Sequence, residues 1–482
     1  MKIAREGGAP VTLCAAPLGG GASWGEDDHI IASLNNSGGL WRVPASGGPP
    51  QPFTDVKGDV EGVTNHRLPQ VLPGGKGTLF IAGDGIALDS LRLLPPSGGT
   101  ARTIVKGCAG GRYLPGGYLA YWKGGDLLAA PVDLGRGELT GPPSPLVEGV
   151  ARDHVHGADF DVAPSGTLVY RKGAAGAKRD LVWLDPSGVK ESVGLKPGGY
   201  ITPRLSPDGK HVALTIVSEG QAHLWTFDLA HRTMTRLTFG GEPKCCPVWT
   251  SDGKFLMFSS NGALAFVLSD GSGKQERLTP AERNSVPWSI SRDGEWLAFH
   301  RNDLETGTDV WVAPLERTPG TLRVGQAKAM VRRPGIQAAP SISPDGRWMA
   351  HGSDESGQVE LYVVPFSPDE PVRNGRWQVS NKKIASPGWC RDCQAIFYRG
   401  AADRRIRVVR YTVKGDSFVP DTPLIWSGQQ LADVGIVPSF DIAPDGKRVL
   451  AVVETTEPRS DEVHLRVVLN VADELRRRFA AR

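Results

Sequence analysis

The stretch YITPRLSPDGKHVALTIV, residues 200–217, joins two apolar runs through a Ser-Pro-Asp-Gly turn. The run after the turn alternates in polarity, which is typical of a β-strand rather than a helix. Asp-Gly suits a tight hairpin because the turn requires positive φ near its centre, and glycine adopts that conformation without a Cβ penalty. Two further apolar stretches, residues 223–229 and 234–239, complete a unit of four short predicted strands.

The same unit recurs along the whole chain. Clear copies of the turn lie at residues 206–209, 251–253, 292–294, 344–346 and 444–446, and weaker copies lie at 24–27, 72–75, 114–117, 163–166 and 390–393. Their spacing of roughly 41 to 53 residues matches the length of a four-stranded propeller blade. The sequence therefore predicts an all-β propeller of about ten four-stranded blades, closed as a single large ring or as two smaller rings.

The clarity of the repeats predicts three segments. Residues 1–198 hold degenerate blades, residues 199–471 hold the clear Ser-Pro-Asp-Gly blades, and residues 472–482 form a short basic helical tail. If there are two rings, GLKPGG at 194–199 is the expected hinge. Residues 1–13 resemble the outer strands of the first repeat, so we expect them to complete the last blade beside strand 463–469; alternatively, an upstream part of a longer parent chain is missing.

Composition excludes several classes of partner. Lys and Arg number 55 against 52 Asp and Glu, a formal charge of +3, which lacks the basic field that nucleic-acid binding requires. No apolar stretch reaches the about 18 residues of a membrane span, and the start MKIAREGGAP lacks the apolar core of a secretory signal. We expect a monomer without a membrane segment. Its location stays open: cytoplasmic as written, or periplasmic if a membrane-anchored portion precedes it.

Several motifs carry a resemblance to known families. The Ser-Pro-Asp-Gly turns, the strand LWTFDL at 224–229, DVWV at 309–312 and SDESGQVELYV at 353–363 resemble TolB-like, WD40-like propellers. HRLPQ at 66–70 and VVLN at 467–470 make the order of units similar to the propeller region that follows the kinase domain in bacterial serine/threonine kinases. That resemblance implies a sensory or protein-binding module. It implies no kinase activity, because the sequence lacks the glycine-rich loop and the catalytic loop of a kinase.

The repeat also predicts which side chains border a central channel. The innermost strand of a blade begins near the axis, so residues about eight positions before each turn are expected there. Counting back gives the following set: His66, Cys108, Tyr200, Lys244, Ser285 and Gln337, with His156 one residue off. This ring is polar without a strong net charge, and it is a candidate site for a small ligand or a peptide end at the channel mouth; the alternative is a channel that holds only water.

Histidines offer an alternative. His154 and His156 alternate along a predicted strand, with Asp153 and Asp159 nearby, and alternate residues of a strand project to one face. Together with His66 they are candidate ligands for a divalent metal. They resemble the histidines that oligogalacturonate lyase-like propellers use near the axis. The simpler interpretation is that His154 and His156 lie in a polar loop that leads into a blade. This interpretation predicts no cofactor.

Two short motifs receive structural interpretations. Gly21–Gly25 (GASWG) matches the G-x-S-x-G pattern of hydrolases, but it lies in a repeat strand rather than in a strand-turn-helix, so Ser23 is not expected to be a nucleophile. Cys390 and Cys393 have the spacing of half a zinc knuckle, but no second pair with that spacing follows. Structural cysteines or a disulfide within the turn are the favoured interpretations.

The sequence thus predicts a non-enzymatic propeller that acts as a protein-binding or peptide-binding sensory module. Two alternatives remain: a metal-dependent lyase or hydrolase acting on a saccharide, and a TolB-like periplasmic assembly factor.

Overall fold

A computed structural model describes residues 1–482 except 5, 17–18, 36–37, 57–62, 64, 84–88, 154–156, 173–177, 219–220, 241, 281–283, 304, 319, 369–374, 436, 456–464 and 481–482. Among the described residues the chain forms β-strands almost throughout, with the helix α1 (Val471–Ala480) and the 3-10 turn η1 (Pro73–Gly75). Contacts divide the chain into two compact units, residues 1–177 with 459–482 (unit 1) and residues 178–458 (unit 2). The predicted all-β propeller class is confirmed, whereas the total of about ten blades stays a prediction.

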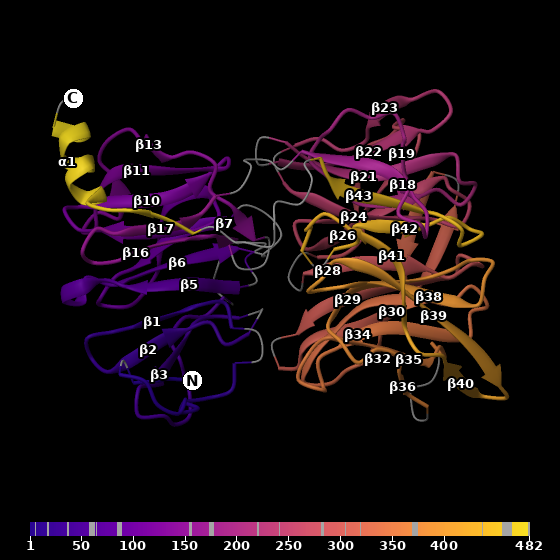
Figure 1. Cartoon of the computed structure of the whole chain (residues 1–482), viewed down its shortest axis with the longest axis horizontal. Coiled ribbons are helices and arrows are strands. Elements are labelled where there is room, and N and C mark those ends of the chain that lie inside the picture. The colour runs from indigo at the N-terminus through magenta and orange to yellow at the C-terminus, as the bar shows by residue number, and fades with distance from the viewer. Residues whose placement is uncertain are drawn as a thin grey trace. The chain divides into compact units, whose positions relative to one another are not determined.

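Unit 1 is built from small antiparallel sheets that follow one another along the chain (Figure 1). The first two sheets comprise β1 (Ala22–Trp24), β2 (His29–Ala32), β3 (Trp41–Pro44) and β4 (Gln51–Pro52), then β5 (Asn65–Val71), β6 (Thr78–Gly83), β7 (Asp89–Leu94) and β8 (Arg102–Cys108). The third comprises β9 (Gly111–Leu114), β10 (Tyr118–Lys123), β11 (Asp126–Asp133), β12 (Glu138–Leu139) and β13 (Ser144–Val147). The short pair β14 (Arg152–Asp153) and β15 (Gly157–Ala158) precedes a last sheet of β16 (Phe160–Val162), β17 (Leu168–Arg171) and β44 (Leu465–Val468).

The C-terminal segment belongs to unit 1 because its apolar side chains complete that core. β44 pairs antiparallel with β17, and Val471 and Leu475 of α1 are buried in a cluster with Leu168 and Tyr170. The expectation that residues 463–469 join residues 1–13 in a last blade is therefore wrong for β44.

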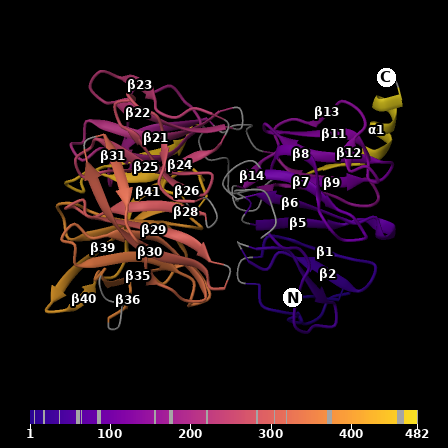
Figure 2. The same cartoon turned by 180° about the vertical axis from the view of Figure 1, so that it is seen from behind.

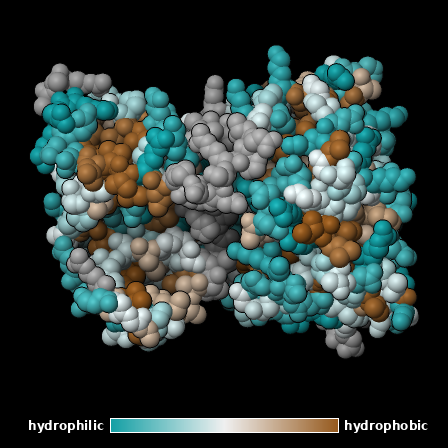
Figure 3. Space-filling view, viewed as in Figure 1, coloured by the Kyte–Doolittle hydropathy of each residue, from teal (hydrophilic) through white to brown (hydrophobic). Residues whose placement is uncertain are grey.

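β44 also presents an apolar face to solvent. Leu465 and Val467 of β44 are 63% and 59% exposed, and Leu469, which directly follows the strand, is 67% exposed. Figure 3, in the view of Figure 1, shows hydrophobic side chains gathered on unit 1 where β44 runs. Each exposed leucine or valine alternates with a residue turned the other way, as the period of a strand requires.

Unit 2 repeats a four-strand pattern (Figures 1 and 2). Its first strands are β18 (Arg179–Leu184), β19 (Lys190–Ser192), β20 (Tyr200–Leu205), β21 (His211–Ser218), β22 (Gln221–Asp228), β23 (Thr233–Arg236), β24 (Lys244–Trp249), β25 (Phe255–Ser260), β26 (Ala263–Leu268) and β27 (Glu276–Arg277). The middle strands are β28 (Ser285–Ile290), β29 (Trp296–Asp303), β30 (Gly307–Thr318), β31 (Thr321–Val324), β32 (Lys328–Val331), β33 (Gly335–Ile342), β34 (Trp348–Ser353), β35 (Glu360–Pro365) and β36 (Trp377–Gln378). The last strands are β37 (Ile384–Trp389), β38 (Ala395–Gly400), β39 (Arg405–Lys414), β40 (Ser417–Pro420), β41 (Leu424–Gln430), β42 (Phe440–Ile442) and β43 (Val449–Glu454).

Unit 2 closes on itself through a sheet made from both ends of its sequence. This closing sheet has the order β19-β18-β43-β42, with Arg179 opposite Glu454 and Leu184 opposite Val449. The inner strands β20, β24, β28, β33, β37 and β42 each contact the next, and β42 contacts β20. Within the described part of unit 2 they therefore form a ring.

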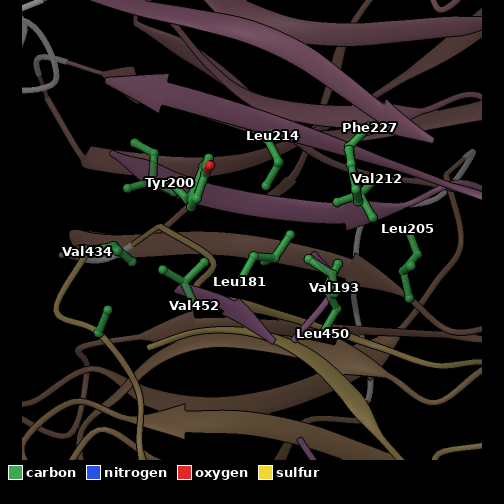
Figure 4. Packing of buried hydrophobic residues seen from close by; sticks show 12 residues of the cluster. Leu181, Val193, Tyr200, Leu205, Val212, Leu214, Phe227, Val434, Leu450 and Val452 are labelled. Carbon is green, nitrogen blue, oxygen red and sulfur yellow. The ribbon is translucent and has the colours of Figure 1, made fainter. Parts of the chain in front are cut away.

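A hydrophobic core lies between the closing sheet and the sheet β20–β23. Figure 4 shows Leu181, Leu450 and Val452 of the closing sheet opposite Val212 and Leu214 of β21. All five are at most 1% exposed. Burying such a side chain contributes about 1.5–3 kcal/mol, so this cluster holds the two ends of the ring together.

The predicted domain boundary differs from the division by contacts. The sequence places a boundary at residues 198/199, between β19 and β20, whereas the contacts assign β18 and β19 to unit 2. Within the described part of the chain, no helix has both the length and the apolar character needed to cross a membrane.

Candidate functional site

The ends of the six inner strands of unit 2 surround a cavity of about 420 Å³, hereafter the axial cavity. Each inner strand is followed by a turn, and the residue two positions before the start of that turn lines the cavity. These six residues are Arg204, Val248, Ser289, Ser341, Gly388 and Asp441. The turns that follow add Pro207, Ser251, Arg292, Pro344 and Arg391. A volume of this size falls within the range of about 300–1,000 Å³ typical of ligand pockets.

A bulge in the inner strands brings these side chains to the axis. The pairing register of β20 with β21 shifts between Ile201 and Arg204, and the same shift recurs in β24, β28, β33 and β37. In β20 the bulge contains Thr202, with φ of 51°, followed by Pro203, which has no amide hydrogen for the ladder. A bulge redirects the side chains that follow it. The Arg204 side chain therefore lines the cavity, and it does not continue the alternation of side chains between the two faces of β20 to which Ile201 belongs.

The Ser-x-Asp-Gly turns fix the rim of the cavity. Ser206 Oγ donates to Asp208 Oδ1 at 2.5 Å, and it accepts from the amide of His211 at 2.9 Å. Asp208 Oδ1 also accepts from the amide of Lys210 at 3.1 Å, and Gly209 has φ of 70°. Thr250–Asp252, Ser291–Asp293 and Ser343–Asp345 repeat these contacts. The recurring sequence motif is thus a hydrogen-bonded turn that holds each strand end in place.

Two of the side chains that lie two positions before an inner turn of unit 2 link their inner strand to the next one around the ring. Asp441 Oδ2 accepts a hydrogen bond from the amide of Leu205 at 2.7 Å, and Ser289 Oγ accepts one from the amide of Ile342 at 3.0 Å. The equivalent position in unit 1 is Ser23, whose Oγ accepts from the amide of Val71 at 2.9 Å. Its hydroxyl therefore serves a link between strands, which agrees with the structural interpretation of the G-x-S-x-G motif.

The charges lining the axial cavity are unequal. They come from Arg204, Arg292, Arg391 and Asp441. Arg204 Nη1 lies 3.9 Å from Asp441 Oδ1 with both side chains about four-fifths buried, and burial raises the pKa of Asp441 although Arg204 and backbone amides oppose the shift. Arg391 donates to the carbonyl of Pro207 at 2.6 Å. Among the described residues Arg292 has no ion pair or hydrogen bond, and it is exposed. The lining is therefore positive overall.

Tryptophans supply the apolar part of the lining. Trp249 Nε1 donates to the carbonyl of Arg204 at 3.0 Å, and Trp389 Nε1 donates to that of Ser341 at 2.8 Å. Trp288 Nε1 donates to Nδ1 of His300 at 2.9 Å, and burial lowers the pKa of His300 to about 4. His300 is therefore neutral at pH 7. Because the indole N–H groups are satisfied by the protein, the rings offer rigid apolar surface to a ligand.

The predicted channel residues of unit 2 lie at the opposite ends of the same strands. Tyr200, Lys244, Ser285 and Gln337 begin or lie near the beginning of β20, β24, β28 and β33, all are buried, and none of them lines the axial cavity. Tyr200 donates to the carbonyl of Lys196 at 2.5 Å. Their role in ligand binding stays a prediction.

Lys244 and Gln337 differ in how their polar groups are satisfied. Lys244 Nζ donates to the carbonyls of Phe239 and Glu242 at 3.0 and 2.6 Å, and burial lowers its pKa. Gln337 is fully buried, and its side-chain amide has no hydrogen-bond partner among the described residues. Lys244 thus caps the loop that precedes β24. In the described part of the chain, the Gln337 amide makes no such contact.

Of the three predicted metal ligands, only His66 lies among the described residues. His154 and His156 lie outside the described residues. His66 is buried in unit 1, where Nδ1 lies 2.8 Å from Thr54 Oγ1 and the ring packs 4.7 Å from that of Phe80. Across the residues that can be described, no group of three His, Cys, Asp or Glu side chains could hold a metal ion. The expectation that no cofactor is needed stays a prediction.

Sequence reasoning missed Arg204, Arg391 and Asp441 as cavity residues. It counted back about eight residues from each turn, whereas these side chains lie two positions before the turn or within it. The sequence does carry a signal: the residue two positions before the start of each inner turn of unit 2 varies between Arg, Val, Ser, Gly and Asp, while the residue after it stays apolar. A position that varies within a repeat is a candidate for ligand contact, although Ser289 and Asp441 also link strands there.

Comparison with known proteins supports the fold. Residues 179–315, all within unit 2, match the TolB beta propeller domain family. A candidate TolB protein from Agrobacterium tumefaciens is 18% identical, with 58% of this chain and 99% of that chain covered and a TM-score of 0.43. TolB from Acinetobacter baumannii is 13% identical, with 83% and 81% covered and a TM-score of 0.39.

An oligogalacturonate lyase in complex with manganese is 14% identical, with 65% of this chain and 82% of that chain covered and a TM-score of 0.38. At these identities the likenesses concern the fold alone. The resemblance to kinase-linked propellers stays a prediction.

Proposed function

We propose that this chain, a TolB-like β-propeller, is a non-enzymatic module that binds a segment of a protein partner in the axial cavity of unit 2. The cavity is formed jointly by all six inner strands, so its shape depends on the closed ring rather than on any one repeat. A binding site that uses the whole ring is preorganised by the fold, which lowers the entropic cost of binding.

The observation that carries this proposal is the composition of the cavity. It combines the indole surfaces of Trp249, Trp288 and Trp389 with an excess of arginine. Aromatic side chains and arginine are the residue types that contribute most to binding energy at protein interfaces.

The charge of the lining indicates an acidic partner. Asp441 is matched by Arg204, which leaves Arg292 and Arg391 to face a ligand. An arginine guanidinium binds a carboxylate through two parallel hydrogen bonds, so a peptide with Asp, Glu or a free C-terminus fits this lining. The proposed ligand is therefore an acidic peptide segment.

Selection from a phage-displayed library of random peptides tests the proposal. We expect purified protein to enrich acidic peptides, whose affinity is then measured by fluorescence anisotropy. Arg292→Glu, which reverses the exposed cavity charge, should weaken binding by about tenfold or more, or about 1.4 kcal/mol. The matched control is Arg323→Glu on β31, an exposed arginine of unit 2 that does not line the cavity.

The control defines the failure of the proposal. If both reversals weaken binding equally, the attraction is a general effect of charge and not a property of the axial cavity. If the library yields no peptide, or yields peptides that bind Arg292→Glu as well as the unaltered protein, the axial cavity is not the binding site.

A further inference from the structure

The fifth inner turn of unit 2 departs from the hydrogen-bonded pattern. The other five inner turns have Gly at the fourth position and, except for the turn at Ala443, Ser or Thr at the first; this turn reads Cys390-Arg391-Asp392-Cys393. The two cysteines form a disulfide, so a covalent bond replaces the hydrogen bond that Ser206 makes to Asp208 in the first turn.

The disulfide turn contacts the next inner turn of the ring. Cys390 Sγ lies 3.7 Å from the carbonyl oxygen of Pro444, and the amide of Asp392 donates to the same oxygen at 3.1 Å. Gly446 packs directly on the disulfide: a Cβ built there would lie 2.7 Å from Cys393 Sγ and 2.9 Å from Cys390 Sγ. Pro444 and Gly446 follow β42, which belongs to the closing sheet.

Arg391 extends the contact to a third turn. Its Nη1 donates to the carbonyl of Pro207 at 2.6 Å, and Pro207 follows β20, the first inner strand of the ring. The four-residue disulfide turn thus connects β37, β42 and β20, which are the strands on both sides of the closure. Both Arg391 and the preceding Trp389 line the axial cavity.

We propose that the Cys390–Cys393 pair is a thiol-disulfide modification site whose oxidised form holds Arg391 in place and so sets the affinity of the axial cavity. The part concerning affinity rests on the function proposed above. The part concerning the modification site rests on the contacts of the turn alone.

The chemistry is an exchange with a dithiol reductant. One thiolate of the reductant attacks Cys393 Sγ, the S–S bond breaks, and Cys390 leaves as a thiolate that takes up a proton. The second thiol of the reductant then displaces Cys393, which is protonated in turn. The two cysteines gain two electrons and two protons, and the reductant becomes a disulfide. Reoxidation reverses the sequence.

Access favours attack at one sulfur. Cys393 is partly exposed, whereas Cys390 is 2% exposed. After reduction the turn retains neither the covalent link nor a serine hydroxyl, and a thiol is only a weak hydrogen-bond donor. Position 393 also lacks the glycine that the fourth position of the other turns provides. The reduced turn is therefore expected to loosen, and Arg391 with it.

A first experiment compares oxidised and dithiothreitol-reduced protein by amide hydrogen exchange, without any ligand. Reduction is expected to speed exchange in residues 390–395 and 443–448 and to leave the first turn, residues 206–211, unchanged. The matched variant Cys390→Ser/Cys393→Gly recreates a Ser-Arg-Asp-Gly turn, and its exchange should not respond to the reductant. Equal exchange in the oxidised and reduced forms of the unaltered protein would overturn the modification site, whether or not the double variant folds.

A second experiment uses an acidic peptide selected as described above. Reduction is expected to lower its affinity by about tenfold, and the double variant should keep its affinity in both conditions. If reduction speeds amide hydrogen exchange but leaves the affinity for the peptide unchanged, the proposal that the disulfide regulates the cavity is wrong. The proposal that the cavity binds an acidic peptide would then still hold. If no peptide binds in either form, the binding proposal fails, and the exchange experiment still decides the modification site.

Discussion

The carboxylate of Asp441 accepts a hydrogen bond from the backbone amide of Leu205 at 2.7 Å, and this contact joins the last inner strand of unit 2 to the first. It lies at the closure of the ring, where no peptide bond connects the two strands. Ser289 makes the equivalent link to Ile342 between neighbouring strands in the middle of the ring. This hydrogen bond therefore adds a direct link between β42 and β20 to the pairing of β18 with β43 at the closure.

Asp441→Ala should destabilise unit 2 by about 1–3 kcal/mol, because it leaves a buried amide and Arg204 without their partner. Asp441→Asn keeps an acceptor for Leu205 and should lose about 1 kcal/mol less. Urea unfolding measures both variants, and Asp416→Ala, at a fully exposed position, is the control. Equal stability of Asp441→Ala and the control would rule out a role in closure.

The contribution of Asp441 to the stability of unit 2 should depend on pH in a defined direction. Burial raises the pKa of Asp441 in the folded state, so the protonated carboxyl is favoured by folding. The stability of the unaltered protein relative to Asp441→Asn should increase as the pH falls through that raised pKa. Urea unfolding of both proteins at pH 7 and pH 4 measures the difference, and a decrease on acidification would contradict the assignment.

His300 should make unit 2 sensitive to acid. Its folded-state pKa of about 4 lies below the ordinary value of 6.5, so the stability it contributes is present above pH 6.5 and is lost as the pH falls towards 4. Between pH 7 and 4.5 the loss is about 2 kcal/mol. His300→Gln, which can still accept from Trp288, should lose correspondingly less over this range in urea unfolding. Parallel pH profiles for the two proteins would show that His300 does not titrate in this way.

The turn motif makes a pair of opposite predictions. Ser206→Ala removes two hydrogen bonds and should destabilise unit 2 by about 1–2 kcal/mol. The turn at Ala443 has Asp445 and Gly446 but no hydroxyl, so Ala443→Ser should stabilise the protein by about 0.5–1 kcal/mol. Thermal unfolding measures both. A loss of stability in both variants would mean that the hydroxyl is not what fixes these turns.

Ser23 should behave as a structural residue. Ser23→Ala removes the acceptor of the Val71 amide and should cost about 1 kcal/mol of the stability of unit 1, whereas Ser46→Ala, at an exposed position, should cost little. A fluorophosphonate probe, which labels activated serines, should not react with Ser23. Labelling that disappears in Ser23→Ala would instead identify a nucleophile.

The repeats were predictable because their signals are local. The Asp-Gly turn at 208–209 and the alternation after it lie within one hairpin, so the strands around Tyr200–Ser218 follow from the sequence alone. The replacement of that turn by Cys390 and Cys393 was also visible, and a disulfide within the turn was among the favoured interpretations.

Ring closure was not predictable in the same way. β18 pairs with β43, and nothing near Leu181 in the sequence identifies Val452 as its partner, because that pairing is specified by the burial of both strands in one core. The cavity residues were missed for a related reason. The bulge at Thr202 changes which side chains face the axis, and a period of two residues does not anticipate it.

A crystal structure of the protein with a selected acidic peptide tests whether a partner binds in the axial cavity of unit 2. We expect density for the peptide between the ends of the inner strands, with a carboxylate against Arg292 or Arg391 and side chains on Trp249 or Trp389. Density for the peptide on the outer edges of the sheets, or beside Tyr200 and Gln337 at the opposite strand ends, would contradict it.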